Sequence, residues 1–242
     1  MKRFTPHDKS LIFAADVEDL NQLAYFGHTL KGIEGLSAIK IGFRMGFRQL
    51  ETAVKTIKKQ DGDMVVIYDH QKAGNDIPEM GKGFAHDLKS AGVDVAILFP
   101  FAGPRAQTAW TENCLNAGLQ VMTGGIMTHP EFLVSEGGYI ADDAPLRIYC
   151  LAAELGVRHF VVPGNKPMWV RKIGALLVEL LGKGNFTLSA PGFITQGGTL
   201  SQCGAVAGSF WHAIVGSAIY NAVNPREVAT KLASQILAMN GQ

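Results

Sequence analysis

AIKIGFRMGFRQLETAVKTIKKQDGDMVVIYD, residues 38–69, contains two short apolar segments separated by a longer amphipathic one. Residues 38–42 and 64–69 are rich in isoleucine and valine, which favours strands, whereas residues 46–60 have the pattern of an amphipathic helix. A strand, a helix and a second strand form the unit from which parallel sheets are built, and near-continuous apolar strands indicate that both faces of the sheet are covered. This segment therefore predicts an α/β fold with a parallel sheet.

The same alternation recurs along the chain. Further helices are predicted at residues 19–33, 167–183 and 224–239, the last with Asn224 and Pro225 at its start. No linker or low-complexity segment divides the sequence, so we expect a single (β/α)8 TIM barrel that forms one domain over residues 1–242. The eight predicted strands are residues 11–16, 38–42, 64–69, 93–99, 119–124, 158–164, 186–192 and 212–218.

Charge and hydropathy argue against several classes of partner. The 22 basic and 21 acidic residues give a net charge of +1, which does not favour nucleic-acid binding. The apolar run at residues 11–15 is too short for the core of a signal peptide, and no run approaches the roughly 18 apolar residues of a membrane span. Cys114, Cys150 and Cys203 are far apart, which predicts no disulfide framework and a cytoplasmic location.

Charged residues at the carboxyl ends of the predicted strands are the first candidates for a site, because active sites of such barrels lie there. Asp16 directly follows the first strand, and a role as N-cap of the next helix explains it equally well. Lys40 interrupts the second strand, where a charge must be paired or functional. The alternative for Lys40 is a side chain whose ammonium reaches solvent at the strand edge.

The third predicted strand leads into DHQKAGNDIP, residues 69–78, which carries Asp69, Lys72 and Asp76. On a regular strand Asp69 and Lys72 would point to opposite faces, so one catalytic cluster requires a bulge or a strand that ends at Asp69. The alternative is a solvated loop in which Asp76 and Pro78 begin the next helix. The seven histidines show no metal-ligand spacing, so no metal site is predicted.

The segment SAPGFITQGGTLSQ, residues 189–202, has the character of a phosphate-binding loop, since glycines let backbone N–H groups approach an anion closely. Barrels of this type often bind phosphate at the loops after their seventh and eighth strands. A glycine pair after a strand can also be a simple turn. The residues expected at the phosphate are Gln196, Gly197, Gly198, Gly216 and Ser217.

Together these motifs resemble the orotidine 5′-monophosphate decarboxylase family over nearly the whole chain. The family signature Asp-x-Lys-x-x-Asp-Ile-Pro is similar to residues 69–78, and its Pro-Gly-(three residues)-Gln-Gly-Gly loop is similar to PGFITQGG at 191–198. MTHP at 127–130 resembles the family's Met-Ser-His-Pro, and IVGSAIYNAVNP at 214–225 its last strand. The pairing of Asp-Ile-Pro with Gln-Gly-Gly separates this family from the hexulose-phosphate synthases and ketogulonate-phosphate decarboxylases of the same superfamily.

The resemblance implies decarboxylation of orotidine 5′-monophosphate to uridine 5′-monophosphate in pyrimidine synthesis, without metal or organic cofactor. It implies Lys72 as general acid, with Lys40 and Asp69 keeping it charged and oriented, and a homodimer in which Asp76 completes the neighbouring subunit's site. The substrate-binding residues that it implies are Asp16, Thr128, Pro191, Gln196, Gly197, Gly198, Gly216 and Ser217.

Three departures from the family pattern are visible. The signature is one residue longer on each side of Lys72, Ser217 stands where the family has a phosphate-binding arginine, and Met80 replaces a threonine. Two alternative functions therefore stay open. One is a metal-dependent barrel aldolase or decarboxylase acting on a sugar phosphate, and the other is a non-catalytic nucleotide-binding paralogue.

The departures also raise two questions about individual residues. His70 is the alternative to Asp69 for the family's first aspartate, and Asp69 is preferred because a histidine cannot supply a fixed negative charge. With Ser217 in place of arginine, backbone amides are expected to hold most of the phosphate. Lys166 and Arg44 are the cations that could supplement them.

Overall fold

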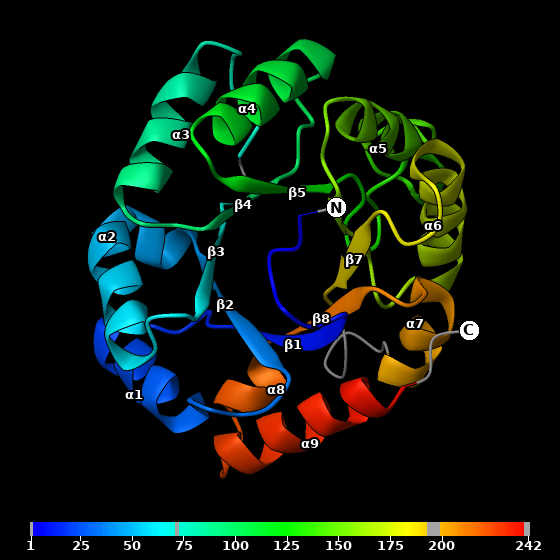
Figure 1. Ribbon diagram of the computed structural model, residues 1–242. Coiled ribbons are helices and arrows are strands. Elements are labelled where there is room, and N and C mark those ends of the chain that lie inside the picture. Colours follow the sequence, from blue (N-terminus) through cyan, green and yellow to red (C-terminus); the bar gives the residue numbers. More distant parts are fainter. Residues whose placement is uncertain (1, 71–72, 193–198, 240–242) are drawn as a thin grey trace.

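A computed structural model describes residues 2–70, 73–192 and 199–239 of the chain (Figure 1). Eight parallel strands form one closed barrel, in which consecutive strands are neighbours and the last pairs with the first. This arrangement confirms the predicted (β/α)8 barrel. The strands are β1 (Lys9–Ala14), β2 (Leu36–Gly42), β3 (Val65–Asp69), β4 (Val95–Leu98), β5 (Gln120–Gly124), β6 (His159–Val161), β7 (Thr187–Ala190) and β8 (Trp211–Val215).

Helices follow the strands and surround the barrel on its outside (Figure 1). In the described part of the chain, no helix is both long enough and apolar enough to cross a membrane. The helices are α1 (Leu20–Leu30), α2 (Phe43–Gln60), α3 (Met80–Ser90), α4 (Pro104–Asn116), the 3-10 turn η1 (Val134–Glu136), α5 (Ala144–Glu154), α6 (Pro167–Leu181), α7 (Leu200–Ala207), α8 (Ser217–Tyr220) and α9 (Pro225–Ala238).

Alternation along the strands divides the apolar residues between two cores. A small core fills the inside of the barrel, and it includes the inward-pointing side chains of Ile12, Ile67 and Ile97. Phe13 and Tyr68, one position along their strands, point outward into the larger core between the sheet and the helices. Because both faces of each strand are buried, the strands read as continuous apolar segments in the sequence.

The N-terminal segment crosses the opening of the barrel at the amino ends of the strands (Figure 1). Phe4 packs there between His159 and His212, with ring centroids 5.1 and 4.7 Å away. His159 Nε2 donates to the carbonyl oxygen of Lys2 at 3.2 Å, and His212 Nδ1 lies 2.7 Å from Ser10 Oγ. An aromatic plug and a hydrogen-bonded polar layer thus close this end, which leaves the opposite end for the site.

Several predicted strand ends extend too far. The sixth strand stops at Val161, two residues before Pro163, and the seventh stops at Ala190, directly before Pro191, because proline lacks the N–H that a strand ladder needs. The predicted eighth strand was wrong beyond Val215, because Gly216 ends it and Ser217–Tyr220 form helix α8. The apolar run in the sequence is longer than the paired segment in each case.

Two of the alternatives, which used acidic residues to begin helices, are not what the structure has. Asp16 is not the N-cap of α1, because Asp19 Oδ1 accepts a hydrogen bond from Gln22 N at 2.9 Å and fills that position. Asp76 and Pro78 do not begin α3, which starts at Met80. The expected cap of the last helix is confirmed, since the Asn224 side chain accepts from the backbone N–H of Glu227.

Candidate active site

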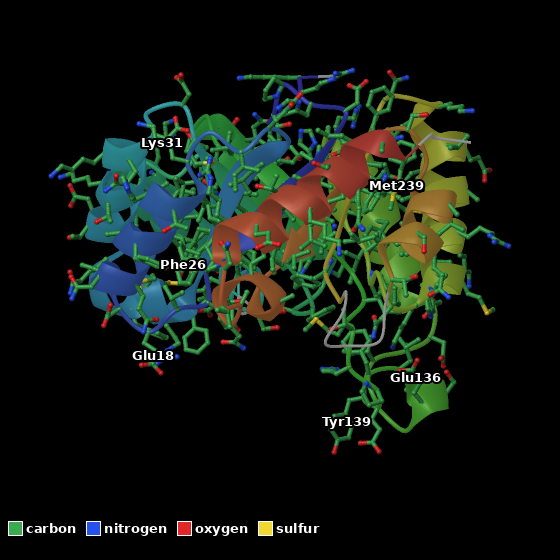
Figure 2. All side chains as sticks on the ribbon, turned by 90° about the horizontal axis from the view of Figure 1, so that it is seen from below. Glu18, Phe26, Lys31, Glu136, Tyr139 and Met239 are labelled. Atoms are coloured by element: carbon green, nitrogen blue, oxygen red, sulfur yellow. The ribbon has the colours of Figure 1, made fainter. Side chains whose placement is uncertain are left out.

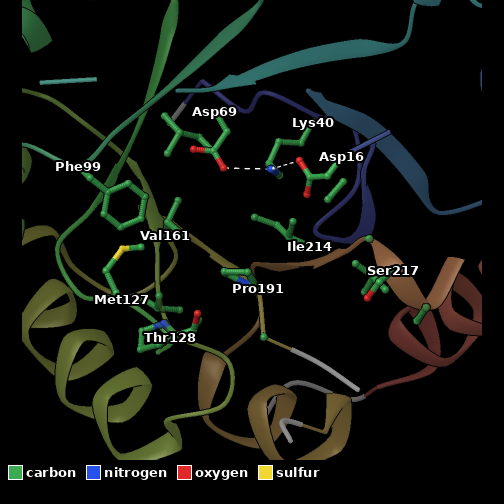
Figure 3. Close-up of a pocket in the computed structure, with 18 of the residues that line it drawn as sticks. Asp16, Lys40, Asp69, Phe99, Met127, Thr128, Val161, Pro191, Ile214 and Ser217 are labelled. Carbon is green, nitrogen blue, oxygen red and sulfur yellow. Dashed lines mark hydrogen bonds and ion pairs between the residues drawn. The ribbon is translucent and has the colours of Figure 1, made fainter. Parts of the chain in front are cut away.

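A pocket of about 340 Å³ opens at the carboxyl ends of the strands, where the barrel rule places active sites (Figure 3). Its floor is apolar and is formed by inward-facing residues such as Ala14, Ile97 and Ile214. Charged residues lie along one side, on β1, β2 and β3, and the exits of β7 and β8 form another. The pocket therefore offers distinct regions for a charged reacting group and for an anion.

The charged side is built around Lys40, which is almost fully buried on β2 between Ala14 and Ile67 of the adjacent strands. Its Nζ lies 3.0 Å from Asp69 Oδ2 and 3.4 Å from Asp16 Oδ1 (Figure 3). Lys40 is thus paired inside the barrel, and its ammonium is not at the strand edge in solvent.

Burial lowers the pKa of Lys40, but the charges and hydrogen bonds of Asp69 and Asp16 outweigh it, and the pKa lies above its ordinary value. Lys40 is consequently a permanent cation at neutral pH. Among the described residues, the carboxylates of Asp69 and Asp16 share this one ammonium.

Asp69 and His70 have different positions, which bears on which of them takes the family's first aspartate. Asp69 is the last residue of β3, points into the barrel like Ile67, and lines the pocket with only 7% of its surface exposed. The His70 ring instead contacts the hydroxyl of Tyr68 and faces the ring of Phe47 at 5.8 Å. Of the two possibilities, a bulge or a strand that ends at Asp69, the structure has the second. Asp69 lines the pocket and His70 does not, which favours Asp69 as the counterpart of the family's first aspartate.

An apolar wall faces the charged side, and residue-by-residue reading of the sequence did not identify it. Phe99, Met127 and Val161 form this wall at the exits of β4, β5 and β6 (Figure 3). Gly124 makes room for it, because a Cβ atom there would lie 2.3 Å from the Phe99 ring. Thr128, which the motif MTHP indicated, does line the pocket beside this wall.

The remaining region of the pocket is formed by Pro191, Gly216 and Ser217 at the exits of β7 and β8. Gly216 is required by close packing, since a Cβ atom would lie 3.0 Å from the carbonyl oxygen of Ala14. The expected phosphate residues Gln196, Gly197 and Gly198, and the expected general acid Lys72, lie outside the described residues.

Asp76 is exposed, its Oδ1 accepts from the N–H of Ile77 at 2.7 Å, and it does not line the pocket. Lys166 does not line the pocket either, and its ammonium pairs with Glu136 at 3.2 Å. Arg44 lies in an adjacent hollow that shares Asp16 with the pocket. Neither expected cation lines the pocket beside Ser217, although the hollow that holds Arg44 also includes Tyr220 at the end of α8.

Across the described residues, no group of three or more histidine, cysteine or acidic side chains is arranged to hold a metal ion. The carboxylates of the pocket, Asp16 and Asp69, are instead engaged by Lys40. The side chains present therefore form a pocket of fixed charges, with no preformed cluster of donors for a cation.

Comparison with known proteins places this geometry in a family. A comparison with models of protein families gave no match. Orotidine 5′-phosphate decarboxylase from Methanosarcina barkeri is 32% identical over 231 residues, which cover 94% of this chain and 95% of that protein. The enzyme of the same name from Methanosarcina mazei is 30% identical over the same shares of both chains.

Solved structures give the same answer for the fold. An orotidine 5′-monophosphate decarboxylase from Methanocaldococcus jannaschii, complexed with the inhibitor BMP, superimposes with a TM-score of 0.81 at 24% identity and covers 95% of this chain and 99% of its own. The orotidine 5′-phosphate decarboxylase from Pyrococcus horikoshii has a TM-score of 0.76 at 25% identity, covering 94% and 100%. Sequence identity over almost the whole length, on the same barrel, shows that the chain belongs to the orotidine 5′-phosphate decarboxylase family.

Proposed function

We propose that the protein converts orotidine 5′-monophosphate to uridine 5′-monophosphate and carbon dioxide, as a step of pyrimidine synthesis. The observation that carries this proposal is the buried Lys40 ammonium, fixed between Asp69 and Asp16 at the edge of a pocket. A buried ion pair adds little net stability, so stability alone does not account for it, whereas an array of fixed charges suits a reaction that is accelerated by electrostatic stabilisation. Family membership supplies the substrate.

The chemistry needs two events at carbon 6 of the pyrimidine. The bond from C6 to the carboxylate carbon breaks, carbon dioxide leaves, and the electron pair stays on C6, which then takes a proton. We assign Lys72 as the donor of that proton from its position in the family signature. Lys40 neutralises and orients Asp69, which stands beside the departing carboxylate and close to the developing charge.

We propose one orientation of the substrate in the pocket. We place the pyrimidine against Phe99, Met127 and Val161, with Thr128 contacting its polar edge, because this is the apolar part of the pocket. The ribose then lies near Asp16. The phosphate reaches the exits of β7 and β8, where Pro191, Gly216 and Ser217 precede or follow the segment containing Gln196, Gly197 and Gly198. Binding energy from this distant phosphate holds the reacting carbon against the charged side.

Loss of the orotate absorbance after mixing the protein with orotidine 5′-monophosphate tests the proposal directly. We expect turnover that is unchanged by a chelator, because the proposed chemistry uses fixed protein charges in place of a metal. Activity that a chelator abolishes and a divalent ion restores would instead support a metal-dependent barrel enzyme. Nucleotide binding without turnover would identify a non-catalytic paralogue.

We further propose a homodimer in which Asp76 enters the site of the neighbouring subunit. Asp76 is exposed and outside its own pocket, and the apolar side chains of Phe43, Phe47, Ile77 and Met80 are at least half exposed at the starts of α2 and α3 on the same side of the barrel. Large apolar residues gathered on a surface indicate an interface. If this surface is buried against a second subunit, the Asp76 carboxylate comes to lie close to that subunit.

Mixing two inactive proteins, Lys72→Ala and Asp76→Ala, tests the shared site. A heterodimer contains one site with both residues intact, so random exchange should restore about a quarter of the wild-type activity. If subunits exchange, as followed by mass spectrometry of labelled chains, and no activity returns, Asp76 acts within its own subunit.

A cytoplasmic location and a single folding domain complete the proposal, in keeping with three free cysteines and one continuous barrel.

A further inference from the structure

The longest excursion from the barrel in the described chain is the segment 128–140 between β5 and α5, here called the finger. It extends well beyond the other loops, with Glu136 near its end and Tyr139 fully exposed at its tip (Figure 2). Backbone bonds fix its internal shape, since Val134 N donates to Ile140 O at 2.8 Å and Gly138 N to Leu133 O at 2.7 Å. The finger is a compact unit that begins at pocket residue Thr128.

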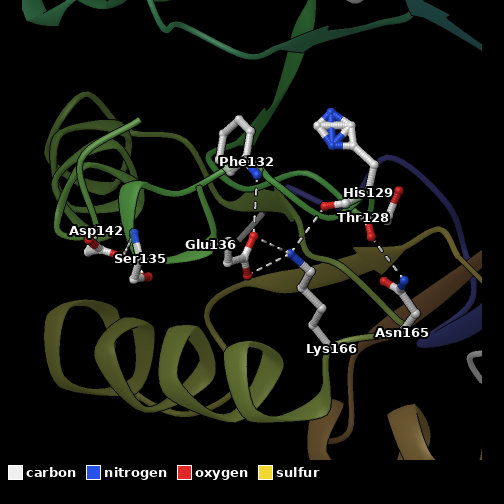
Figure 4. A network of polar contacts seen from close by, with 8 residues as sticks. All are labelled: Thr128, His129, Phe132, Ser135, Glu136, Asp142, Asn165 and Lys166. Carbon is white, nitrogen blue, oxygen red and sulfur yellow. Dashed lines mark hydrogen bonds and ion pairs between the residues drawn. The ribbon is translucent and has the colours of Figure 1, made fainter. Parts of the chain in front are cut away.

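The finger is attached to the exit of β6 by two consecutive side chains (Figure 4). Asn165 Nδ2 donates to the carbonyl oxygen of Thr128 at 3.0 Å. Lys166 Nζ donates to the carbonyl oxygen of His129 at 3.3 Å and to both carboxylate oxygens of Glu136 at 3.2 and 3.3 Å. These contacts hold the start of the finger, and Glu136 farther along it, to one short turn.

Glu136 joins the attachment to the inner structure of the finger. Its Oε2 also accepts from Phe132 N at 3.3 Å, so one carboxylate binds Lys166 and the finger's own backbone. Burial raises the pKa of Glu136, but hydrogen bonds from Lys166 and Phe132 N outweigh it, and the pKa lies below its ordinary value. Glu136 is thus a carboxylate at neutral pH.

The turn that carries Asn165 and Lys166 is itself fixed to the pocket. Val162 and Pro163 line the pocket, Gly164 N donates to Pro191 O at 2.8 Å, and α6 begins immediately after Lys166. A displacement of the finger relative to this turn would therefore move Thr128 relative to the pocket.

Phosphate binding is a poorer assignment for Lys166. In the described chain its ammonium contacts only the finger, where Glu136 already neutralises it, and Lys166 is absent from the pocket lining. An ammonium whose three hydrogen bonds go to a backbone carbonyl and to both oxygens of a carboxylate has little attraction left for a second anion. The expectation of Lys166 at the phosphate is thus not supported by its contacts.

We propose that Lys166 and Asn165 are positioning residues that clamp the finger to the exit of β6 and so hold Thr128 in the pocket. The inference deepens the proposed function, because it takes the base of a nucleotide as the group that Thr128 and its neighbours contact. It predicts that the clamp sets affinity for the base and leaves affinity for the phosphate unchanged.

Lys166→Met is the main variant, since it keeps the aliphatic stem and removes the charge. We expect its Kd for uridine 5′-monophosphate to rise by about three- to tenfold, with the Kd for ribose 5-phosphate unchanged. Lys166→Arg should keep the affinity of the wild type, because a guanidinium can make the same pair with Glu136. Equal weakening for both ligands would place Lys166 at the phosphate and overturn the clamp.

A matched control is Lys58→Met. Lys58 and Asp94 form an ion pair at 2.8 Å whose side chains are also partly exposed, at the amino end of the barrel strands. Lys58→Met should lower the stability of the protein as much as Lys166→Met does. It should leave the affinities for uridine 5′-monophosphate and for ribose 5-phosphate unchanged. If Lys58→Met weakens uridine 5′-monophosphate equally, the effect of Lys166→Met reflects general destabilisation and the proposal fails.

Hydrogen exchange of the ligand-free protein tests the clamp without reference to the substrate. Protection of the amides of residues 128–140 should fall by about tenfold in Lys166→Met and stay unchanged in Lys166→Arg and Lys58→Met. Unchanged protection in Lys166→Met would refute the clamp. If wild-type protein binds neither ligand, the proposed function fails, whereas the exchange result still decides whether the finger is clamped.

Discussion

Lys40 Nζ lies 3.0 Å from Asp69 Oδ2, and both side chains are only 9% exposed, so β2 and β3 are joined by an ion pair inside the barrel. Removing one partner of such a pair leaves an uncompensated buried charge, whereas replacing both by apolar residues removes that cost. The pair therefore allows the stability of the barrel to be separated from the proposed activity.

We expect Lys40→Met to lower the free energy of unfolding by about 3–5 kcal/mol, because the Asp69 and Asp16 carboxylates then lose the buried ammonium that both contact. The double variant Lys40→Met/Asp69→Leu should recover most of that stability and stay inactive. Denaturant unfolding and turnover of orotidine 5′-monophosphate are measured on all three proteins. A double variant with near-normal turnover would show that these charges have no part in the chemistry.

Gly124→Ala tests the apolar wall of the pocket. The new Cβ atom would lie 2.3 Å from the Phe99 ring, so the ring must move. We expect uridine 5′-monophosphate to bind at least about fivefold more weakly, with a stability loss of about 1–3 kcal/mol from overpacking. Calorimetry gives the affinity and thermal unfolding the stability.

Two further variants complete this test. Phe99→Leu in the Gly124→Ala background should recover part of the affinity, because the smaller side chain relieves the clash. Gly83→Ala, on the exposed face of α3 where a Cβ atom would meet nothing within 4 Å, should leave binding unchanged. Wild-type affinity in Gly124→Ala would remove Phe99 from the binding surface.

The histidines at the amino end of the barrel predict instability in acid. Burial lowers the pKa of His159 to about 4 and that of His212 to about 3, the latter with contributions from His159, His7 and Arg3. The unfolded chain takes up protons near pH 6.5 while the folded chain does not, so stability falls as the pH drops from 6.5 toward 4. Each histidine should cost on the order of 1 kcal/mol per pH unit in this window.

Thermal unfolding between pH 7.5 and pH 5 measures this dependence. The variant His159→Gln/His212→Gln should be less stable at pH 7.5, because its hydrogen bonds to Ser10 and Thr187 are altered, but should show a shallower decline. His28→Gln, at an exposed position of α1, should decline as the wild type does. Equal slopes in all three proteins would mean that the buried histidines do not titrate differently on unfolding.

The barrel could be predicted because its strands are buried on both faces. Such strands are near-continuous apolar segments, and these alternate with amphipathic helices along the sequence. The sequence also predicted that Lys40 is paired or functional, since a charge inside an apolar strand has few structural explanations. Asp16 remained ambiguous, because N-caps and ligand contacts use the same residue types, and only the position of Asp19 decided it. The local sequence thus indicates which charged residues need an explanation. Tertiary packing then decides whether each has a structural role or lines the pocket.

Other features depend on contacts between distant segments. Phe99 and Met127 meet only after the barrel closes, and Gly124 is needed for a ring that belongs to another strand. The finger is tied to Lys166 across 30 residues of sequence by the pair with Glu136. A single sequence carries no signal for such pairings, which is why Lys166 was considered beside Arg44 as a cation that could supplement the phosphate site.

Ser217→Arg tests how the phosphate is held. Ser217 lines the pocket at the start of α8, and neither Lys166 nor Arg44 lines that pocket. An arginine there would add charge-assisted hydrogen bonds to the phosphate oxygens, which backbone amides alone do not supply. We expect uridine 5′-monophosphate to bind about tenfold more tightly, near 1.4 kcal/mol, with a stronger dependence on salt.

The matched control is Val223→Arg, which adds the same charge at a fully exposed position just beyond α8. It should leave the affinity nearly unchanged, because an exposed charge is screened by salt and solvent. Uridine, which lacks the phosphate, should bind all three proteins alike. If Ser217→Arg tightens binding no more than Val223→Arg, or tightens uridine equally, the phosphate does not lie at Ser217, and its binding region must be sought elsewhere on the rim.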